Sequence, residues 1–207
     1  MPPPDPRSSL LRNRLRVVFL VSAALASSAT ILQAQARAAA SRLGDLQIGG
    51  GFTLADSDYD RPRFIGAAVY IDFDPDRRWG IELALHQVHT TSNAKYTSDL
   101  YERTYEVGGR YLLRRYGRLV PYAKGMVGRG VFNYPLVYVT PTKLTAEANE
   151  AYNLLAGGGG GDYRLTRHVH LRAEYEYQQW FRFPPHGLSP QMITFGAAYH
   201  FAGELSR

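Results

Sequence analysis

Apolar and polar side chains alternate through residues 169–178, VHLRAEYEYQ. Odd positions carry apolar or aromatic side chains, and even positions carry charged or polar ones. Because a β-strand sends successive side chains to opposite faces, this segment predicts a strand with one apolar face and one charged face. Residues 192–201, MITFGAAYHF, repeat the pattern with apolar or aromatic side chains at odd positions. An apolar outside around a polar inside is typical of a β-barrel in a bilayer.

Alternation and turn-forming residues together predict eight strands, at about residues 45–55, 63–73, 79–90, 101–113, 119–132, 151–163, 168–182 and 191–201. The segments between them are alternately longer and shorter along the chain. Short turns at one end and longer loops at the other are typical of an outer-membrane barrel, whose long loops face outside the cell. The predicted fold is therefore all-β, an eight-stranded antiparallel up-and-down transmembrane β-barrel.

The same alternation predicts which charged side chains enter the lumen. The inward face carries Glu82, Glu106, Arg110, Arg172 and Glu174. Charges removed from water need partners, so opposite signs in a narrow lumen should pair. The fifth strand is ambiguous, because Lys124 and Arg129 fall on opposite faces. A bulge, or an Arg129 that snorkels near the strand end, would reconcile the two.

Aromatic residues gather near the predicted strand ends, where ring girdles of membrane barrels meet the lipid headgroups. They are Phe73, Trp79, Tyr101, Phe132, Tyr134, Tyr163, Trp180, Phe181, Tyr199 and Phe201. The short turns are rich in arginine, which suits contact with the anionic headgroups of outer-membrane lipids. An ordinary soluble β core built from the same residues is the alternative. A soluble eight-stranded barrel should turn its apolar face inward, and the charged faces of these strands would then all lie on its surface.

The N-terminus predicts a secretory signal peptide over residues 1–36, followed by the barrel domain over residues 37–207. Arginines precede an apolar run, residues 17–32, and the small-residue motif Ala34-Gln35-Ala36 follows it. A membrane-anchoring helix is the alternative, but the run is interrupted by serine and threonine and is shorter than the roughly 20 residues that a span needs. Cleavage would lower the formal net charge from +6 to +3, so the basic composition does not indicate nucleic-acid binding. The 207 residues contain no cysteine, which excludes disulfides.

Longer motifs resemble a known family. LAGGGGGDYRLTRHVHLRAEYEYQQW, the terminal MITFGAAYHF, GRLVPYAKGMVGRG and WGIELAL are similar to the eight-stranded barrel of the outer-membrane protein A type, the outer-membrane β-barrel domain family. The resemblance covers roughly residues 43–201. It implies that Tyr199 and Phe201 belong to a terminal assembly signal for the barrel-insertion machinery, although six residues follow Phe201. Larger members carry a peptidoglycan-binding domain after the barrel, and we do not expect that activity here.

The family prototype has a cluster of acidic and basic side chains that crosses the lumen and acts as a gate. By motif, the resemblance implies that Glu82, Arg110, Asp162 and Arg172 lie where that cluster would be. A structural plug is the simpler interpretation, because eight strands leave an interior just wide enough for side chains to fill.

No other motif predicts catalysis, a cofactor or a metal. His86 and His89 are three positions apart and should face opposite sides of their strand, while His168 and His170 lack a nearby carboxylate or cysteine at ligand spacing. Gly157–Gly161 lacks the lysine and helix of a phosphate-binding loop. A lipid A-modifying enzyme remains the enzymatic alternative, and His86 or His89 near Thr90, Thr91 and Ser92 would be its only candidate residues.

We therefore expect a non-enzymatic, monomeric protein of the bacterial outer membrane that has a plugged polar lumen and serves envelope integrity or surface interaction. Its expected partners are outer-membrane lipids, the barrel-assembly machinery and an extracellular ligand that the loops do not identify. A narrow ion or small-solute pore is the second hypothesis.

The signal peptide generates the first prediction: the mature protein begins at Arg37 and fractionates with outer membranes. N-terminal sequencing of the membrane fraction checks it. Retention of residues 1–36, or recovery from the soluble periplasm, would contradict it.

Overall fold

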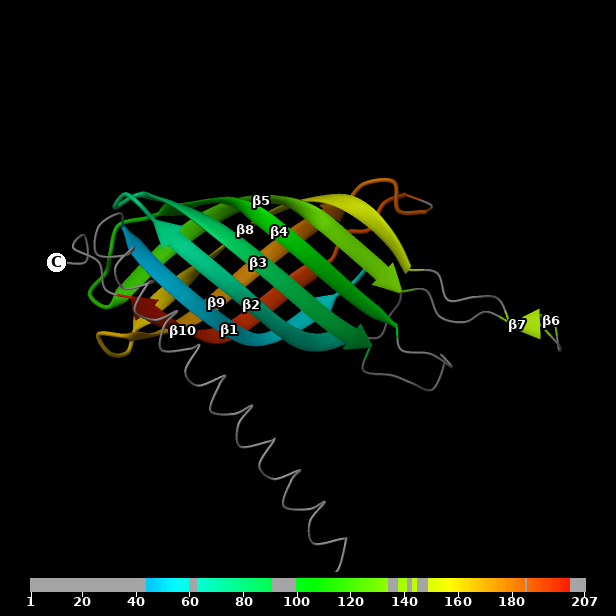
Figure 1. The fold of residues 1–207 in the computed structure, drawn as a ribbon, viewed down its shortest axis with the longest axis horizontal. Helices are drawn as coiled ribbons and strands as arrows, with labels where there is room; N and C mark the ends of the chain where they lie inside the picture. The colour runs from blue at the N-terminus through cyan, green and yellow to red at the C-terminus, as the bar shows by residue number, and fades with distance from the viewer. Residues whose placement is uncertain are drawn as a thin grey trace, which may run out of the picture.

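The computed structural model describes residues 44–59, 63–90, 100–133, 138–140, 143–144, 149–184 and 186–201. Its eight long strands form one closed antiparallel barrel, in which each strand pairs with its neighbours along the chain and the last pairs with the first (Figure 1). This confirms the predicted fold. No helix among these residues is long and apolar enough to cross a membrane.

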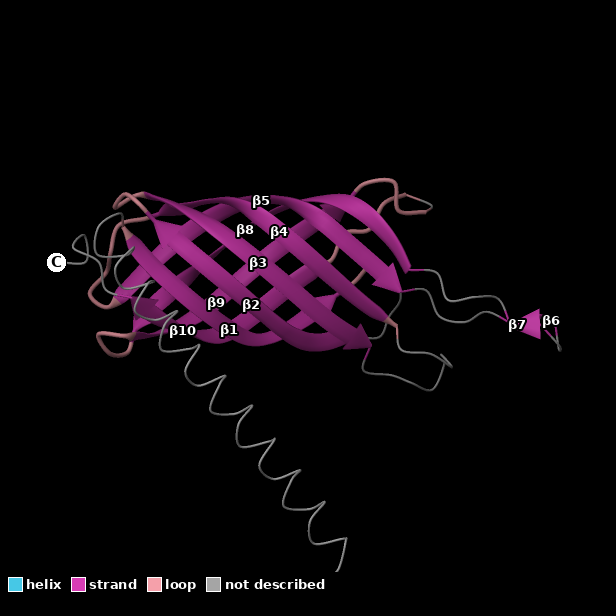
Figure 2. Ribbon diagram, in the orientation of Figure 1, coloured by secondary structure: helices cyan, strands magenta, loops and turns pink. Residues whose placement is uncertain are grey.

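The barrel strands lie within a few residues of their predicted bounds. They are β1 (Asp45–Asp56), β2 (Phe64–Asp74), β3 (Trp79–Thr90), β4 (Tyr101–Leu112), β5 (Leu119–Asn133), β8 (Asn149–Arg164), β9 (Val169–Trp180) and β10 (Gln191–Phe201). Two short strands, β6 (Tyr138–Thr140) and β7 (Lys143–Leu144), pair with each other in a segment that was predicted to be a loop. They lie beyond the end of the barrel (Figure 2).

The two ends of the barrel differ, and we name them by their connections. The turn end carries the short turns β2–β3, β4–β5 and β8–β9 together with the start of β1 and the end of β10; the loop end carries the longer connections (Figure 1). Closure of the barrel pairs Leu46 with Phe201 at the turn end and Asp56 with Gln191 at the loop end. Because the sheet has no free edge, its backbone groups are satisfied within the wall, as a bilayer requires.

Side-chain burial follows the predicted alternation. In β9, Glu176 is 1% exposed and Gln178 is fully buried, whereas Tyr175 and Tyr177 are 45% and 40% exposed. The other barrel strands also turn apolar residues outward, including Val69, Leu83 and Phe195. The barrel therefore has its charged side chains inside and an apolar outer surface, the reverse of a soluble barrel.

The structure resolves the ambiguity of the fifth strand without a bulge. β5 pairs in unbroken register with β4 and β8. Lys124 is buried in the lumen, while Arg129 lies exposed on the outer face, where it donates to Asn153 Oδ1 at 3.3 Å. Arg129 lies in the last third of its strand, toward the loop end, which suits the snorkelling interpretation.

Three of the expected girdle residues are more buried than a headgroup-facing ring should be. Phe132 and Trp180 are fully buried, because their positions in β5 and β9 have the parity of the inward-facing Lys124 and Glu176. Their assignment to the girdle was wrong, and alternation alone would have corrected it. Phe201 is 6% exposed and contacts the Tyr199 ring at 4.8 Å between centroids.

The facing pattern predicts that Leu83→Arg destabilises the barrel by about 2–4 kcal/mol, since Leu83 lies in the middle of β3 on the lipid face. Leu165→Arg is the matched control, because its side chain is equally exposed (49% against 48%) but lies in the β8–β9 turn, where an arginine costs only about 0–1 kcal/mol. Urea titrations of the refolded barrels measure both. Equal losses of unfolding free energy in the two variants would show that the position of the arginine along the barrel axis does not decide its effect on stability.

Candidate functional site

Arg172 of β9 is the centre of an ion network in the half of the lumen nearer the turn end. Its guanidinium contacts three carboxylates: Asp72 at 2.5 Å, Asp162 at 2.8 Å and Glu82 at 3.2 Å. It also lies over the ring of Tyr70, with Cζ 3.9 Å from the ring centroid. The fork of nitrogens on an arginine suits this arrangement, because it can donate to several carboxylates at once.

Arg110 of β4 enters the same group of carboxylates from the other side. Its guanidinium lies 2.5 Å from Asp72 and 2.8 Å from Asp162, and it packs over the ring of Tyr122 at 4.5 Å. Two arginines thus share the same two aspartates. The two aspartates therefore hold both arginines close together despite their like charge.

Lys124 of β5 extends the network toward the loop end. Its Nζ lies 2.8 Å from Glu82 and 2.7 Å from both Glu174 and Glu176. Glu174 also accepts a hydrogen bond from the hydroxyl of Tyr122. Glu82 therefore links Lys124 to the arginines, and the charged groups form one continuous network.

The structure brings together five of the six residues expected in the network: Glu82, Arg110, Asp162, Arg172 and Glu174. Glu106 faces the lumen but forms no ion pair with a described residue; its Oε1 accepts from Thr104 and Gln178. The sequence analysis did not include Asp72, Lys124 or Glu176. Alternation placed Asp72 and Glu176 inward, so that signal existed, whereas Lys124 needed the register of β5.

Acidic groups outnumber basic ones in this lumen. Among the described residues, eight carboxylic side chains and three lysine or arginine side chains are buried. The acids are Asp72, Asp74, Glu82, Glu102, Glu106, Asp162, Glu174 and Glu176. Because unpaired charge is costly in a low dielectric, each basic group serves several carboxylates, and the remaining acids need protons or another cation.

An apolar layer fills the lumen at the loop end. It comprises Phe64, Val88, Leu100, Phe132, Trp180, Phe183 and Leu188, all at most 2% exposed. The Phe132 and Phe183 rings meet edge to face at 5.0 Å, and Tyr59 from the β1–β2 loop contacts both. Gly130 makes room for the layer, since a Cβ there would lie 2.4 Å from the Trp180 ring. The lumen thus holds the ion network toward one end and the apolar layer, with the buried Glu102 beside it, at the other.

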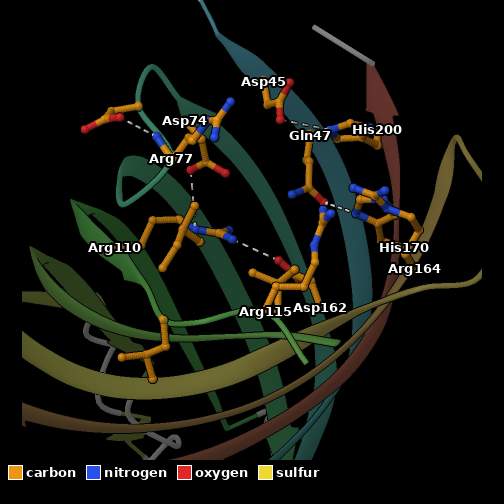
Figure 3. Close-up of a pocket in the computed structure, with 14 residues that line it drawn as sticks. Asp45, Gln47, Asp74, Arg77, Arg110, Arg115, Asp162, Arg164, His170 and His200 are labelled. Carbon is orange, nitrogen blue, oxygen red and sulfur yellow. Dashed lines mark hydrogen bonds and ion pairs between the residues drawn. The ribbon is translucent and has the colours of Figure 1, made fainter. Parts of the chain in front are cut away.

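A cavity of about 320 Å³ opens at the turn end and stops at the ion network (Figure 3). Arg110 reaches across its floor between Asp74 and Asp162. On its wall the rings of His170 and His200 stack at 4.6 Å. Three arginines of the short turns or strand ends, Arg77, Arg115 and Arg164, line the cavity. Part of the basic turn region thus faces the lumen mouth as well as the lipid.

The residues considered for catalysis do not form an active site in the described part of the chain. His86 faces the lumen at 2% exposure, whereas His89 has the opposite parity and contacts Gln87 at 3.0 Å. Residues 91 and 92, the other candidates beside them, lie outside the described residues. Gly157–Gly161 lie within β8, where the absence of side chains admits Tyr122: a Cβ on Gly160 would lie 2.9 Å from the Tyr122 hydroxyl.

Solved structures share this architecture at low sequence identity. Ail, the attachment invasion locus protein of Yersinia pestis, matches with a TM-score of 0.54 and 16% identity, over 76% of this chain and 98% of Ail. Neisserial surface protein A matches with a TM-score of 0.60 and 11% identity, over 75% of this chain and 95% of its own. OprG from Pseudomonas aeruginosa matches with a TM-score of 0.52 and 17% identity, over 76% and 95%.

No curated protein sequence matches the chain. The model of the outer membrane protein beta-barrel domain matches residues 22–201, which include every barrel strand. The chain belongs to this family and is an integral barrel of the bacterial outer membrane.

Proposed function

We propose that this outer-membrane barrel is a closed, non-enzymatic protein that serves envelope integrity or surface interaction. One observation carries the proposal: side chains fill the lumen in two successive layers, an ion network and an apolar layer. Eight strands enclose an interior that side chains can fill, so the two layers suffice to plug it.

The ion network supports a structural role, because it joins strands that are not neighbours in the wall. Its members come from β2, β3, β4, β5, β8 and β9, six of the eight barrel strands. Arg172 alone connects β9 to Asp72 on β2 and Glu82 on β3. The two remaining strands, β1 and β10, are neighbours in the wall, and their Thr53 and Thr194 hydroxyls pair at 2.9 Å. The ion pairs that cross the lumen resist deformation of the barrel.

The second candidate function is a narrow pore, and the cavity at the turn end favours it. A conducting path would have to continue through the ion network and then through the apolar layer. Opening the network would separate buried opposite charges, which costs several kcal/mol, and the apolar layer offers a permeating ion few polar groups, the buried carboxylate of Glu102 among them. These costs favour the closed barrel.

Surface interaction would use the loop end, which faces outside the cell in barrels of this type. We propose that the longer connections contact the extracellular partner and that the protein acts as a monomer. Terminal residues Tyr199 and Phe201 remain the proposed signal for the barrel-assembly machinery. A lipid A-modifying activity is the least favoured alternative, because its two candidate histidines lie on opposite faces of β3, with His86 enclosed in the lumen and only His89 outside.

Planar-bilayer recording of the purified barrel tests closure. We expect no stable unitary conductance from the wild-type protein under conditions in which a known porin conducts. Reproducible unitary currents from the wild-type barrel would favour the pore and contradict the proposal.

Arg172→Ala tests the network itself. The substitution removes the counter-ion of several buried carboxylates, and we expect a loss of about 3–5 kcal/mol in the free energy of unfolding. Arg129→Ala is the control, because Arg129 is exposed and contacts only an amide and a carbonyl; we expect a change within roughly 0.5 kcal/mol.

Conductance of the same Arg172→Ala variant separates plug from gate. If the apolar layer closes the lumen independently, the variant is less stable but remains closed. A variant that conducts while staying folded would assign the gate to the ion network. An unchanged free energy of unfolding in Arg172→Ala would show that the ion network does not stabilise the fold.

A further inference from the structure

Three side chains that can bind metals meet in the lumen between the ion network and the apolar layer. They are His86 of β3, Glu106 of β4 and Glu176 of β9, and one possible ligand atom of each lies within 4.8 Å of the others. All three are buried, at 2%, 5% and 1% exposure. Alternation separates His86 from His89, which argued against a metal, and it gives no sign that His86 meets carboxylates from two other strands.

His86 is the feature that points to a ligand. Neither of its ring nitrogens makes a hydrogen bond with any described residue, and neither does Glu106 Oε2. Buried polar atoms are normally satisfied, so an imidazole with two unused nitrogens facing two carboxylates needs a partner. Apolar packing does not explain a histidine at this position.

Gln178 holds one oxygen of each carboxylate in place, and Lys124 contacts the second oxygen of Glu176. Gln178 Nε2 donates to Oε1 of Glu106 at 2.8 Å and to Oε1 of Glu176 at 2.7 Å. Trp180 Nε1 in turn donates to Gln178 Oε1 at 2.8 Å. Orienting contacts of this kind are characteristic of metal sites, where outer groups fix the ligating atoms.

The local charge balance also favours a cation. Lys124 lies 2.7 Å from Glu176 Oε2, but it shares its single charge with Glu82 and Glu174. Glu106 has no ion-pair partner among the described residues. The lumen as a whole carries eight buried acids against three buried basic groups, so a divalent cation here would reduce the excess.

We propose that His86, Glu106 and Glu176 bind one divalent transition-metal cation, with Zn²⁺ as the best match. One imidazole nitrogen and two carboxylate oxygens are a ligand set that Zn²⁺ accepts, with water as a fourth ligand. Binding would bring the three groups to the Zn–O and Zn–N distances of about 2.0–2.2 Å. The ion would cross-link β3, β4 and β9 in the middle of the lumen. Mg²⁺ and Ca²⁺ fit less well, because they prefer oxygen ligands alone.

Metal content after refolding tests the site. The barrel is refolded from urea into detergent with Zn²⁺, free metal is removed by gel filtration, and bound zinc is measured by mass spectrometry. We expect about one bound zinc per wild-type barrel. In His86→Gln and Glu106→Gln we expect the bound zinc to fall by roughly tenfold or more. His89→Gln is the matched control, since it removes a histidine of the same strand that faces outward, and it should keep its zinc. His170→Gln is a second control, since it removes one histidine of the stacked pair at the turn end, and it should also keep its zinc.

Stability supplies a second measurement. Zinc should raise the urea midpoint of the wild-type barrel relative to an EDTA-treated sample, and the shift should vanish in Glu106→Gln even if His86→Gln fails to refold. Cobalt substitution of the wild type should give visible absorption bands of a low-coordinate site. Wild-type protein that binds no zinc, or that shows no zinc-dependent shift, overturns the proposal and leaves the two glutamates to share a proton. Loss of zinc in His170→Gln with retention in His86→Gln also overturns it.

Discussion

The pairing of charges inside the lumen is the constraint on which the rest of this structure depends. The outer face of the wall is apolar, so the polar residues of the barrel strands must find partners within a space only as wide as a few side chains. Arg172 shows how this is achieved, because one guanidinium satisfies carboxylates from three strands and lies flat on the ring of Tyr70. Removing a single partner would leave its neighbours unpaired, which makes the network cooperative.

Packing around the charges requires an unusual distribution of small and large residues. Gly49 admits the Tyr70 ring, since a Cβ there would lie 2.4 Å from it, and Gly130 does the same for Trp180. The aromatic rings that occupy this space cover the arginines on one side and build the apolar layer on the other. In β8, Gly160 likewise admits the hydroxyl of Tyr122, since a Cβ there would lie 2.9 Å from it.

The two layers divide the lumen into functional zones. The turn end has an open, mixed-charge cavity, the middle has an excess of acids around Lys124, and the loop end holds the apolar layer with Glu102 beside it. A closed barrel needs only the layers, whereas the proposed metal explains the residues between them. The network and the metal site share Glu176, which Lys124 contacts at 2.7 Å, so a bound metal ion would change the charge balance of the network.

The sequence by itself determined the barrel, which side chains of each strand face the lipid, and the inward position of most of the charges. It could do so because the two-residue period of a strand is local information. It also contained the parity that places Phe132 and Trp180 inside, although their position near strand ends suggested otherwise. Only the tertiary structure decided which charges meet, since residues as distant as Asp72 and Arg172 are brought together by closure of the barrel. The convergence of His86, Glu106 and Glu176 has the same origin: alternation gives the face of each strand, but only the register between strands gives the height at which their side chains meet.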